Sequence, residues 1–210
     1  MLPAPPLLLI TDRKQARSAL PDVVAKALQG GCRWVMLREK DLAGDELRRL
    51  AHELASLCSR HGARLLINGD IATARSVGAD GVHLPAGASA KAARAALGAG
   101  AVIGASAHDK DELARAGEEG ADYATLSPVF ESGSKPGYGP ALGLQRLRSL
   151  AAGAPIPVVA LGGVRPGRVA ACLDSGAAGV AVMGAVMAAA QPEEVTRRLV
   201  DELTGPINRA

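Results

Sequence analysis

Short apolar runs rich in Val, Ile and Leu alternate with longer stretches of helical period along almost the whole 210-residue chain. This alternation is the pattern of βαβ units, in which a helix follows each strand and returns the chain to the same sheet. The predicted strands are residues 7–11, 33–38, 64–68, 81–84, 102–106, 123–127, 157–161 and 179–183. The predicted helices are residues 21–29, 44–60, 72–77, 90–97, 109–119, 144–151, 166–174 and 193–203.

A glycine recurs where a helix gives way to the next strand, in the segments 30–35, 62–66, 78–82, 120–124 and 176–180. Glycine readily takes the left-handed conformation that ends many helices. Such short connections, with no Pro/Gly/Ser linker, favour a closed (β/α)8 TIM barrel over an open doubly wound sheet. We therefore expect an α/β protein with one TIM-barrel domain over residues 1–210, the barrel at about 7–190 and a C-terminal helix at about 193–203.

Charge and composition exclude several classes of partner. The formal net charge is only +3 and aromatic residues make up 2% of the chain, which argues against binding a nucleic acid. The apolar N-terminal run lacks a basic flank and is too short to span a bilayer, so we expect a cytoplasmic protein without a membrane segment. Three scattered cysteines predict buried free thiols. A small-molecule ligand is the expected partner, and a homo-oligomer is compatible with the sequence.

Polar side chains follow several predicted strands, and in such a barrel the carboxyl ends of the strands meet at one mouth. Arg38 and Lys40 follow the second strand, and two cations at one rim suit a phosphate or diphosphate. The alternative is a solvated charged turn in which Glu39 forms a surface ion pair. Asn68 closes the third strand and Ser106 the fifth.

Two histidines also lie near predicted strand ends, His83 in the fourth strand and His108 just after the fifth. Each suits an acid/base or ligand-contact role, and each also fits a hydrogen-bonded structural imidazole. Neither has the spacing of a metal ligand.

Glycine turns follow the last two strands. Gly162 and Gly163 come after the seventh and Gly184 after the eighth, where backbone N–H groups of such barrels commonly bind phosphate. A tight turn is the alternative interpretation.

The loop at 131–139 is longer than most βα connections, which predicts a lid whose Lys135 closes on an anion. A flexible surface loop is the alternative here.

In combination and in this order, seven segments resemble the thiamin-phosphate synthase family and its sister, thiazole tautomerase. The segments are 9–12, 36–40, 66–68, 78–84, 103–108, 128–135 and 157–164. The resemblance runs from Leu8 to about Ala190. It implies a (β/α)8 barrel that handles a hydroxyethylthiazole phosphate. In the synthase, this ligand attacks the methylene of an aminopyrimidine methyl diphosphate, and diphosphate leaves with the help of magnesium.

The resemblance also implies roles for the candidate residues. The matches to the family's diphosphate and pyrimidine contacts are Arg38, Lys40, Asn68, Ser106 and Lys135. The loop residues that replace the family's usual threonines are Ser132 and Ser134. The matches to the thiazole-phosphate site are Gly162, Gly163 and Gly184.

The chain departs from the synthase pattern at the two positions where the family carries magnesium-binding aspartates. Gly69 and Ala88 stand there, so both carboxylates are absent, although magnesium commonly uses one or two. Asp70 could substitute, but a regular strand end would point its side chain elsewhere. We therefore expect a thiazole-phosphate-binding protein of the tautomerase-like or otherwise non-synthase branch. No cofactor is assigned, and magnesium is expected only if synthase activity is retained.

The tautomerase pattern is incomplete as well. The resemblance implies a catalytic histidine where this chain has Ser127, and a serine is not a comparable acid or base near neutral pH. His83 or His108 would then have to transfer the proton. The alternatives are an active synthase with a rebuilt metal site, and a non-catalytic binding or regulatory protein that keeps the glycine phosphate site.

Overall fold

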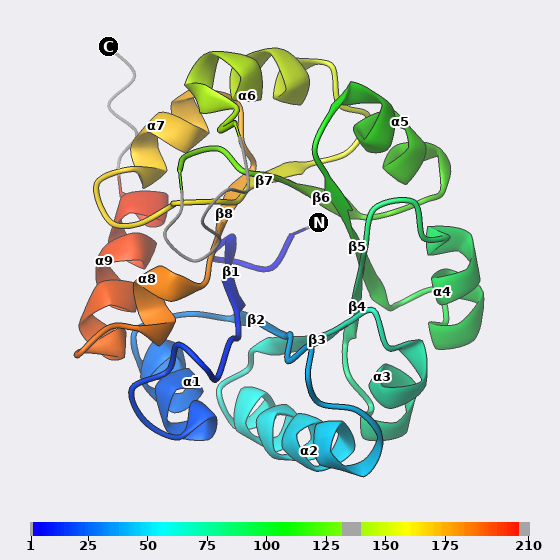
Figure 1. Ribbon diagram of the computed structural model, residues 1–210, viewed down its shortest axis with the longest axis vertical. Coiled ribbons are helices and arrows are strands. Elements are labelled where there is room, and N and C mark those ends of the chain that lie inside the picture. The colour runs from blue at the N-terminus through cyan, green and yellow to red at the C-terminus, as the bar shows by residue number, and fades with distance from the viewer. Residues whose placement is uncertain (1, 132–139, 206–210) are drawn as a thin grey trace.

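The computed structural model describes residues 2–131 and 140–205, and its eight parallel strands close into a barrel in chain order inside a ring of helices (Figure 1). The strands are β1 (Leu7–Ile10), β2 (Trp34–Leu37), β3 (Arg64–Asn68), β4 (Gly81–Leu84), β5 (Val102–Ala107), β6 (Tyr123–Leu126), β7 (Val158–Ala160) and β8 (Gly179–Val182). The helices are α1 (Leu20–Gln29), α2 (Gly44–Arg60), α3 (Ile71–Val77), α4 (Ala90–Leu97), α5 (Lys110–Glu118), α6 (Gly143–Ala152), α7 (Val169–Asp174), α8 (Gly184–Met187) and α9 (Pro192–Thr204). The predicted (β/α)8 barrel is confirmed.

Alternation of side chains along the strands produces two hydrophobic layers. Every second residue points into the barrel, because successive side chains of a strand face opposite sides. The inner cluster consists of Leu8, Ile10, Trp34, Met36, Leu66, Val102, Tyr123, Val159 and Ala181. The outward-facing residues pack against the apolar faces of the helices and form the larger part of the core. The inner cluster fills the barrel, so its interior is a packed core rather than a pore.

The predicted joints between helices and strands are also confirmed. The five glycines in the left-handed region at these joints are Gly31, Gly62, Gly78, Gly120 and Gly176. Asp109 accepts a hydrogen bond from the backbone N–H of Glu112 and caps α5, as expected of an aspartate before a helix. Cys32, Cys58 and Cys172 are buried and free, in agreement with the sequence-based expectation.

Two details of the helix prediction are wrong. Pro166 does not lie within a helix, because Gly167 has a φ of 84° that is incompatible with helical backbone, and α7 begins only at Val169. The carboxylate of Glu202 on α9 accepts the N–H groups of Gly167 and Val169 and so supports the start of α7 from a distant helix. The short helix α8 was not predicted at all, since four residues are too few to show helical periodicity.

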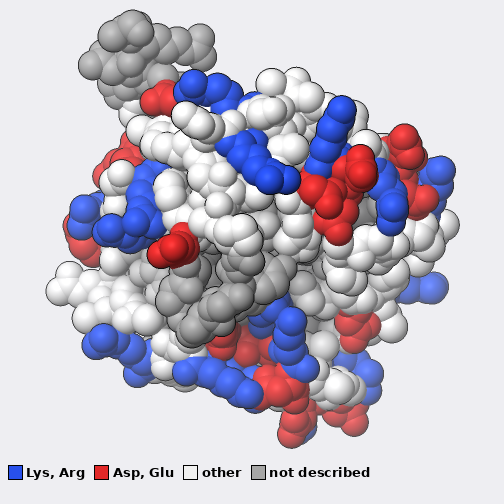
Figure 2. All heavy atoms as spheres, turned by 45° about the horizontal axis from the view of Figure 1, so that its top comes forward, with Lys and Arg blue, Asp and Glu red and all other residues white. Residues whose placement is uncertain are grey.

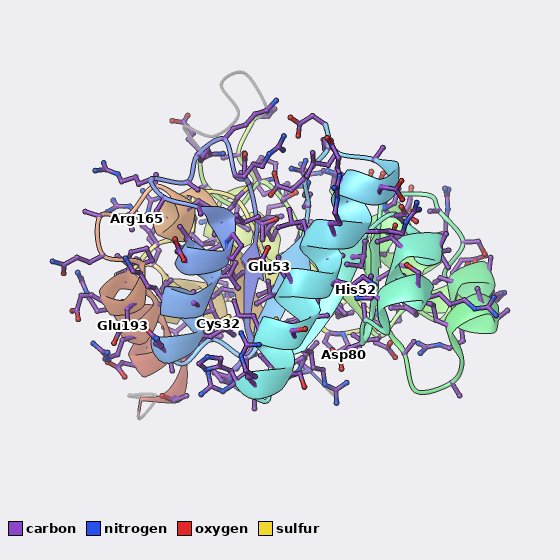
Figure 3. All side chains as sticks on the ribbon, turned by 90° about the horizontal axis from the view of Figure 1, so that it is seen from below. Cys32, His52, Glu53, Asp80, Arg165 and Glu193 are labelled. Carbon is purple, nitrogen blue, oxygen red and sulfur yellow. The ribbon has the colours of Figure 1, made fainter. Side chains whose placement is uncertain are left out.

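The end of the barrel opposite the mouth is closed by aspartates that bind backbone. Asp80 accepts the N–H of Leu65 at 2.8 Å, and Asp122 accepts the N–H of Ile103 at 2.7 Å. Figure 3 shows the barrel from the side, with Asp80 towards this end and Arg165 towards the mouth.

In residues 2–131 and 140–205, no helix is both long and apolar enough to cross a membrane.

Candidate active site

A cavity of about 940 Å³ opens at the mouth between β1, β2 and the ends of β6, β7 and β8. Its volume lies within the range of small-molecule sites. Five of the residues singled out from the sequence line it, namely Arg38, Ser127, Gly162, Gly163 and Gly184. Apolar side chains such as Ile10 and Met183 complete the wall. The cavity thus combines an apolar surface with a few polar groups, as ligand pockets generally do.

The glycine turn after β7 offers unpaired backbone donors to this cavity. Gly162 and Gly163 have φ values of 100° and 63°, and a Cβ on either would lie within 3 Å of atoms of the segment 128–131. The carbonyl of Gly162 accepts the N–H of Phe130, whereas the N–H groups of both glycines have no acceptor among the described residues. Glycine is therefore required by the close backbone packing, and the two amides remain available to an anion.

Four arginines line the cavity, and only Arg38 among them was picked out from the sequence; the others are Arg165, Arg168 and Arg198. The guanidinium of Arg168 donates to the carbonyl of Gly163 at 2.8 Å and lies 4.6 Å from the centre of the Phe130 ring. No local motif marks these three positions, because only the fold brings them to the glycine turn. Figure 2 shows basic and acidic side chains interspersed over the face in view, and the cavity itself is lined by Glu131 as well as by the four arginines.

Glu39 is buried and fastens two loops of the mouth together. Its carboxylate accepts from the Thr11 hydroxyl at 2.7 Å and from the N–H and guanidinium of Arg13. The Thr11 hydroxyl in turn accepts the backbone N–H of Arg38. The alternative for Glu39 was a surface ion pair; Glu39 does pair with Arg13 at 3.2 Å, but its carboxylate is buried rather than at the surface. The sequence places Glu39 directly after Arg38 but gives no sign that it is buried or that Thr11 and Arg13 bind it.

Arg38 lines the cavity, and its charge also acts on His83, which is buried beneath the polar side of the mouth, the part formed by Asn68 of β3 and Ser106 of β5. Its guanidinium makes no hydrogen bond or ion pair with the described residues, although it is only half-exposed. The register of the strands places Asn68 beside His83, and the amide of Asn68 also has no partner in the described part of the chain. These free polar groups can therefore bind a ligand without breaking an existing interaction.

His83 is enclosed in the barrel rather than exposed at the mouth. Burial, with a smaller contribution from the charge of Arg38, lowers the pKa of His83 to about 3. The ring lies 3.1 Å from the Ser106 hydroxyl and 2.9 Å from the Tyr123 hydroxyl. A neutral, fully enclosed imidazole of this kind fits the structural alternative for His83 better than a role as a general base.

The other predicted site residues that the structure describes do not line the cavity. His108 interacts with the Glu112 carboxylate through Nδ1 at 2.9 Å, and Glu112 is in the first turn of α5. Lys40 is exposed in the loop after β2, whereas Asn68 at the end of β3 and Ser106 on β5 are half-exposed. Three predicted contacts, Ser132, Ser134 and Lys135, lie outside the described residues.

The carboxylates near the mouth do not form a magnesium site. Both oxygens of Asp70 are occupied, because one accepts the N–H of Thr73 at 2.8 Å and the other its hydroxyl at 2.7 Å. Asp70 thus caps α3, and its carboxylate is engaged by Thr73. Gly69 and Ala88 supply no side-chain oxygen. Within residues 2–131 and 140–205, no group of three or more His, Cys, Asp or Glu side chains could hold a metal ion. The described residues therefore do not fit a magnesium ion bound by two aspartates, as the resemblance to the thiamin-phosphate synthase family implied.

A closed (β/α)8 barrel with free amides and cations around a cavity at its strand ends is a small-molecule enzyme barrel. The family model described as thiamine monophosphate synthase matches residues 7–186. The chain belongs to that family.

Relatives of known name agree with this assignment. The chain is 45% identical over 196 residues to a putative thiamine-phosphate synthase of Geobacter sulfurreducens, a match that covers 92% of each chain. It is 41% identical to the thiamine-phosphate synthase of Chlorobium luteolum, with 94% of this chain and 92% of the relative covered. Among solved structures, the thiamine phosphate pyrophosphorylase from Pyrococcus furiosus superposes with a TM-score of 0.83 at 30% identity, over 95% and 96% of the two chains. These names favour the synthase, which was the alternative, over the tautomerase-like branch expected from the sequence.

Proposed function

We propose that the protein is a thiamin-phosphate synthase that couples a hydroxyethylthiazole phosphate to an aminopyrimidine methyl diphosphate. In this reaction the thiazole nitrogen forms a bond to the pyrimidine methylene, while the bond from that methylene to the diphosphate oxygen breaks. The electron pair of the broken bond leaves with the diphosphate. The identity of 41–45% to relatives that bear the synthase name over most of their length supports this reaction.

The observation that carries the proposal is the position of Arg38. This residue lines the cavity that contains the glycine turn, and its charge also acts on His83, which is buried beneath the polar side of the mouth. We assign the thiazole phosphate to the amides of Gly162 and Gly163 together with Gly184, and the pyrimidine diphosphate to the opposite side. Arg38 then stands between the two substrates, where bond exchange has to occur.

Cations of the chain supply the electrostatic part of this mechanism. Negative charge grows on the departing diphosphate, and preorganised positive groups stabilise it in the transition state. Arg38 and Lys40 fill this role, with Asn68 and Ser106 as hydrogen-bonding partners of the pyrimidine substrate. Lys135, Ser132 and Ser134 remain proposed contacts of the same substrate.

The proposal is tested by incubating the purified protein with both substrates in excess magnesium and measuring thiamin monophosphate. Product that requires both substrates supports the synthase, with turnover expected in the usual enzyme range of roughly 1–10³ s⁻¹. Absence of product over the same period overturns it.

A second candidate follows from Gly69 and Ala88, which replace the two expected carboxylates. In this second candidate function, the protein binds thiazole phosphate but does not couple it to the pyrimidine substrate, and it acts as a tautomerase-like enzyme or as a regulatory protein. A protein of this kind would gain thermal stability from thiazole phosphate, through binding to the folded state, and would form no thiamin monophosphate. Unphosphorylated hydroxyethylthiazole is the matched control ligand, and a thiazole tautomer assay separates the two roles.

A further inference from the structure

A buried hydrogen-bond network lies beneath the polar side of the mouth, and of its members the coupling step proposed above uses only Ser106. It joins His83 of β4, Ser106 of β5, and Tyr123 and Thr125 of β6 inside the barrel. The Nδ1 atom of His83 lies 2.9 Å from the Tyr123 hydroxyl, whereas its Nε2 atom lies 3.1 Å from Ser106 Oγ and 3.3 Å from Thr125 Oγ1. His83, Tyr123 and Thr125 are buried, and only Ser106 reaches the half-exposed surface of the mouth.

The strand between His83 and Tyr123 leaves a space for this contact. Gly104 on β5 is paired with His83 on one side and with Tyr123 on the other. A Cβ at Gly104 would lie 2.2 Å from Cζ of Tyr123 and 2.4 Å from its hydroxyl oxygen. The tyrosine hydroxyl therefore crosses β5 through a space that no residue larger than glycine leaves open, and the network is built into the barrel.

Hydrogen-bond accounting selects one tautomer of His83. A neutral imidazole has one N–H donor and one acceptor nitrogen. Tyr123 has no hydrogen-bonding partner besides His83 in the described part of the chain, so its O–H is satisfied only if Nδ1 accepts. The opposite tautomer would leave the tyrosine O–H unpaired in the dry interior, which is unfavourable. The N–H of His83 is then at Nε2, where the oxygens of Ser106 and Thr125 accept it.

We propose that His83, held by Tyr123, is a positioning residue that turns the Ser106 hydroxyl hydrogen towards the mouth. With the oxygen of Ser106 occupied by the His83 N–H, the O–H is directed away from the ring and donates to an acceptor atom of the bound ligand. The identity of that ligand as the aminopyrimidine methyl diphosphate rests on the proposed function.

The tautomer can be measured without any substrate. The protein contains four histidines, so ¹⁵N-labelled histidine gives few ring signals, and His83→Asn assigns the signal of His83 by its loss. We expect the Nδ1 of His83 to resonate as an unprotonated ring nitrogen and Nε2 as a protonated one. In Tyr123→Phe, which retains the ring and removes the hydroxyl, this preference should disappear. A wild-type protein in which Nδ1 carries the proton overturns the proposal.

A double-mutant cycle tests whether the network acts through Ser106. By calorimetry, Tyr123→Phe and Ser106→Ala should each weaken binding of the aminopyrimidine methyl diphosphate about five- to tenfold, as expected for one lost hydrogen bond. Binding of the thiazole phosphate should change less than about twofold. In the Ser106→Ala background, Tyr123→Phe should have no further effect. A purely structural role predicts instead that the two losses multiply, or that both ligands are weakened equally.

Thr196→Val is the matched control, because Thr196 also has a buried hydroxyl but donates it to Pro192 of α9, away from the mouth. Its affinity for both ligands should equal that of the wild type. A wild type that binds neither substrate overturns the proposed function, whereas the tautomer measurement still decides the role of His83.

Discussion

At the end of the barrel opposite the mouth, Asp80 and Asp122 accept backbone N–H groups of neighbouring strands. At the mouth, by contrast, the side chains of Arg38, Asn68 and Ser127 make no hydrogen bonds with the described residues. Polar groups that are already paired stabilise the fold, and polar groups that are left free can be used by a ligand. Substitutions at the two ends should therefore separate stability from activity.

The largest expected effect is at the mouth. Arg38→Ala should lower kcat/KM for the coupling reaction about 100-fold or more, because it removes a positive charge from the site where the diphosphate departs. The thermal unfolding midpoint should change little, since no described partner is lost. Arg49→Ala, an exposed arginine on α2, is the control and should keep full activity. An Arg38→Ala protein with unaltered kinetics would contradict the position assigned to this residue.

Glu39 is an exception at the mouth, because its carboxylate is buried and paired. Glu39→Gln should lower the free energy of unfolding by about 2–3 kcal/mol, as hydrogen bonds to a buried charged group are lost. Activity should fall with it, since Thr11 also accepts the backbone N–H of Arg38. Urea unfolding and steady-state kinetics measure the two effects. Loss of activity without loss of stability would show that Glu39 contacts the ligand rather than the loops.

At the opposite end, Asp122→Ala should lower the free energy of unfolding by about 1–2 kcal/mol, because it leaves the N–H of Ile103 without an acceptor. Its kcat and KM should equal those of the wild type below the unfolding transition. Asp174→Ala removes an exposed aspartate whose carboxylate makes no hydrogen bond with the described residues, and it serves as the control. If kcat or KM changes in Asp122→Ala, the proposal that this end of the barrel contributes to stability and not to activity is contradicted.

The smallest effect concerns pH. Burial lowers the pKa of His83 from 6.5 to about 3, so between these values the unfolded chain binds a proton that the folded protein excludes. Stability from this source is complete above pH 6.5 and decreases as the pH falls. At about pH 6 the wild type should have lost roughly 1 kcal/mol relative to His83→Gln. Parallel pH profiles of the two proteins would show that His83 can be protonated in the folded state.

The sequence predicted the architecture well, because hydrophobic periodicity and the glycine joints are local signals. The bounds of β3, β4, α2 and α4 agree with the prediction to the residue. The start of α7 was wrong because Gly167 takes a left-handed conformation and Glu202 supplies the acceptor from α9. Such a partner, 35 residues away, has no signature around Pro166.

The candidate site was predicted only in part. Strand ends indicated Arg38 and the paired glycines, since all strand ends of a parallel barrel meet at one mouth. The contact of Tyr123 with His83 depends on the register across Gly104, which one sequence does not reveal. The arginines near the glycine turn come from α9 and from the segment that precedes α7, so proximity in space and not along the chain brings them there.

The bond between Glu202 and the backbone of Gly167 has a consequence for synthesis of the protein. Ribosomes produce the chain from the N-terminus, so all eight strands are made before Glu202 emerges. Until then the segment that follows the glycine pair lacks its anchor on α9. The segment that follows the glycine pair can therefore be fixed only once α9 has docked on the barrel, so its packing depends on one of the last parts of the chain to be made.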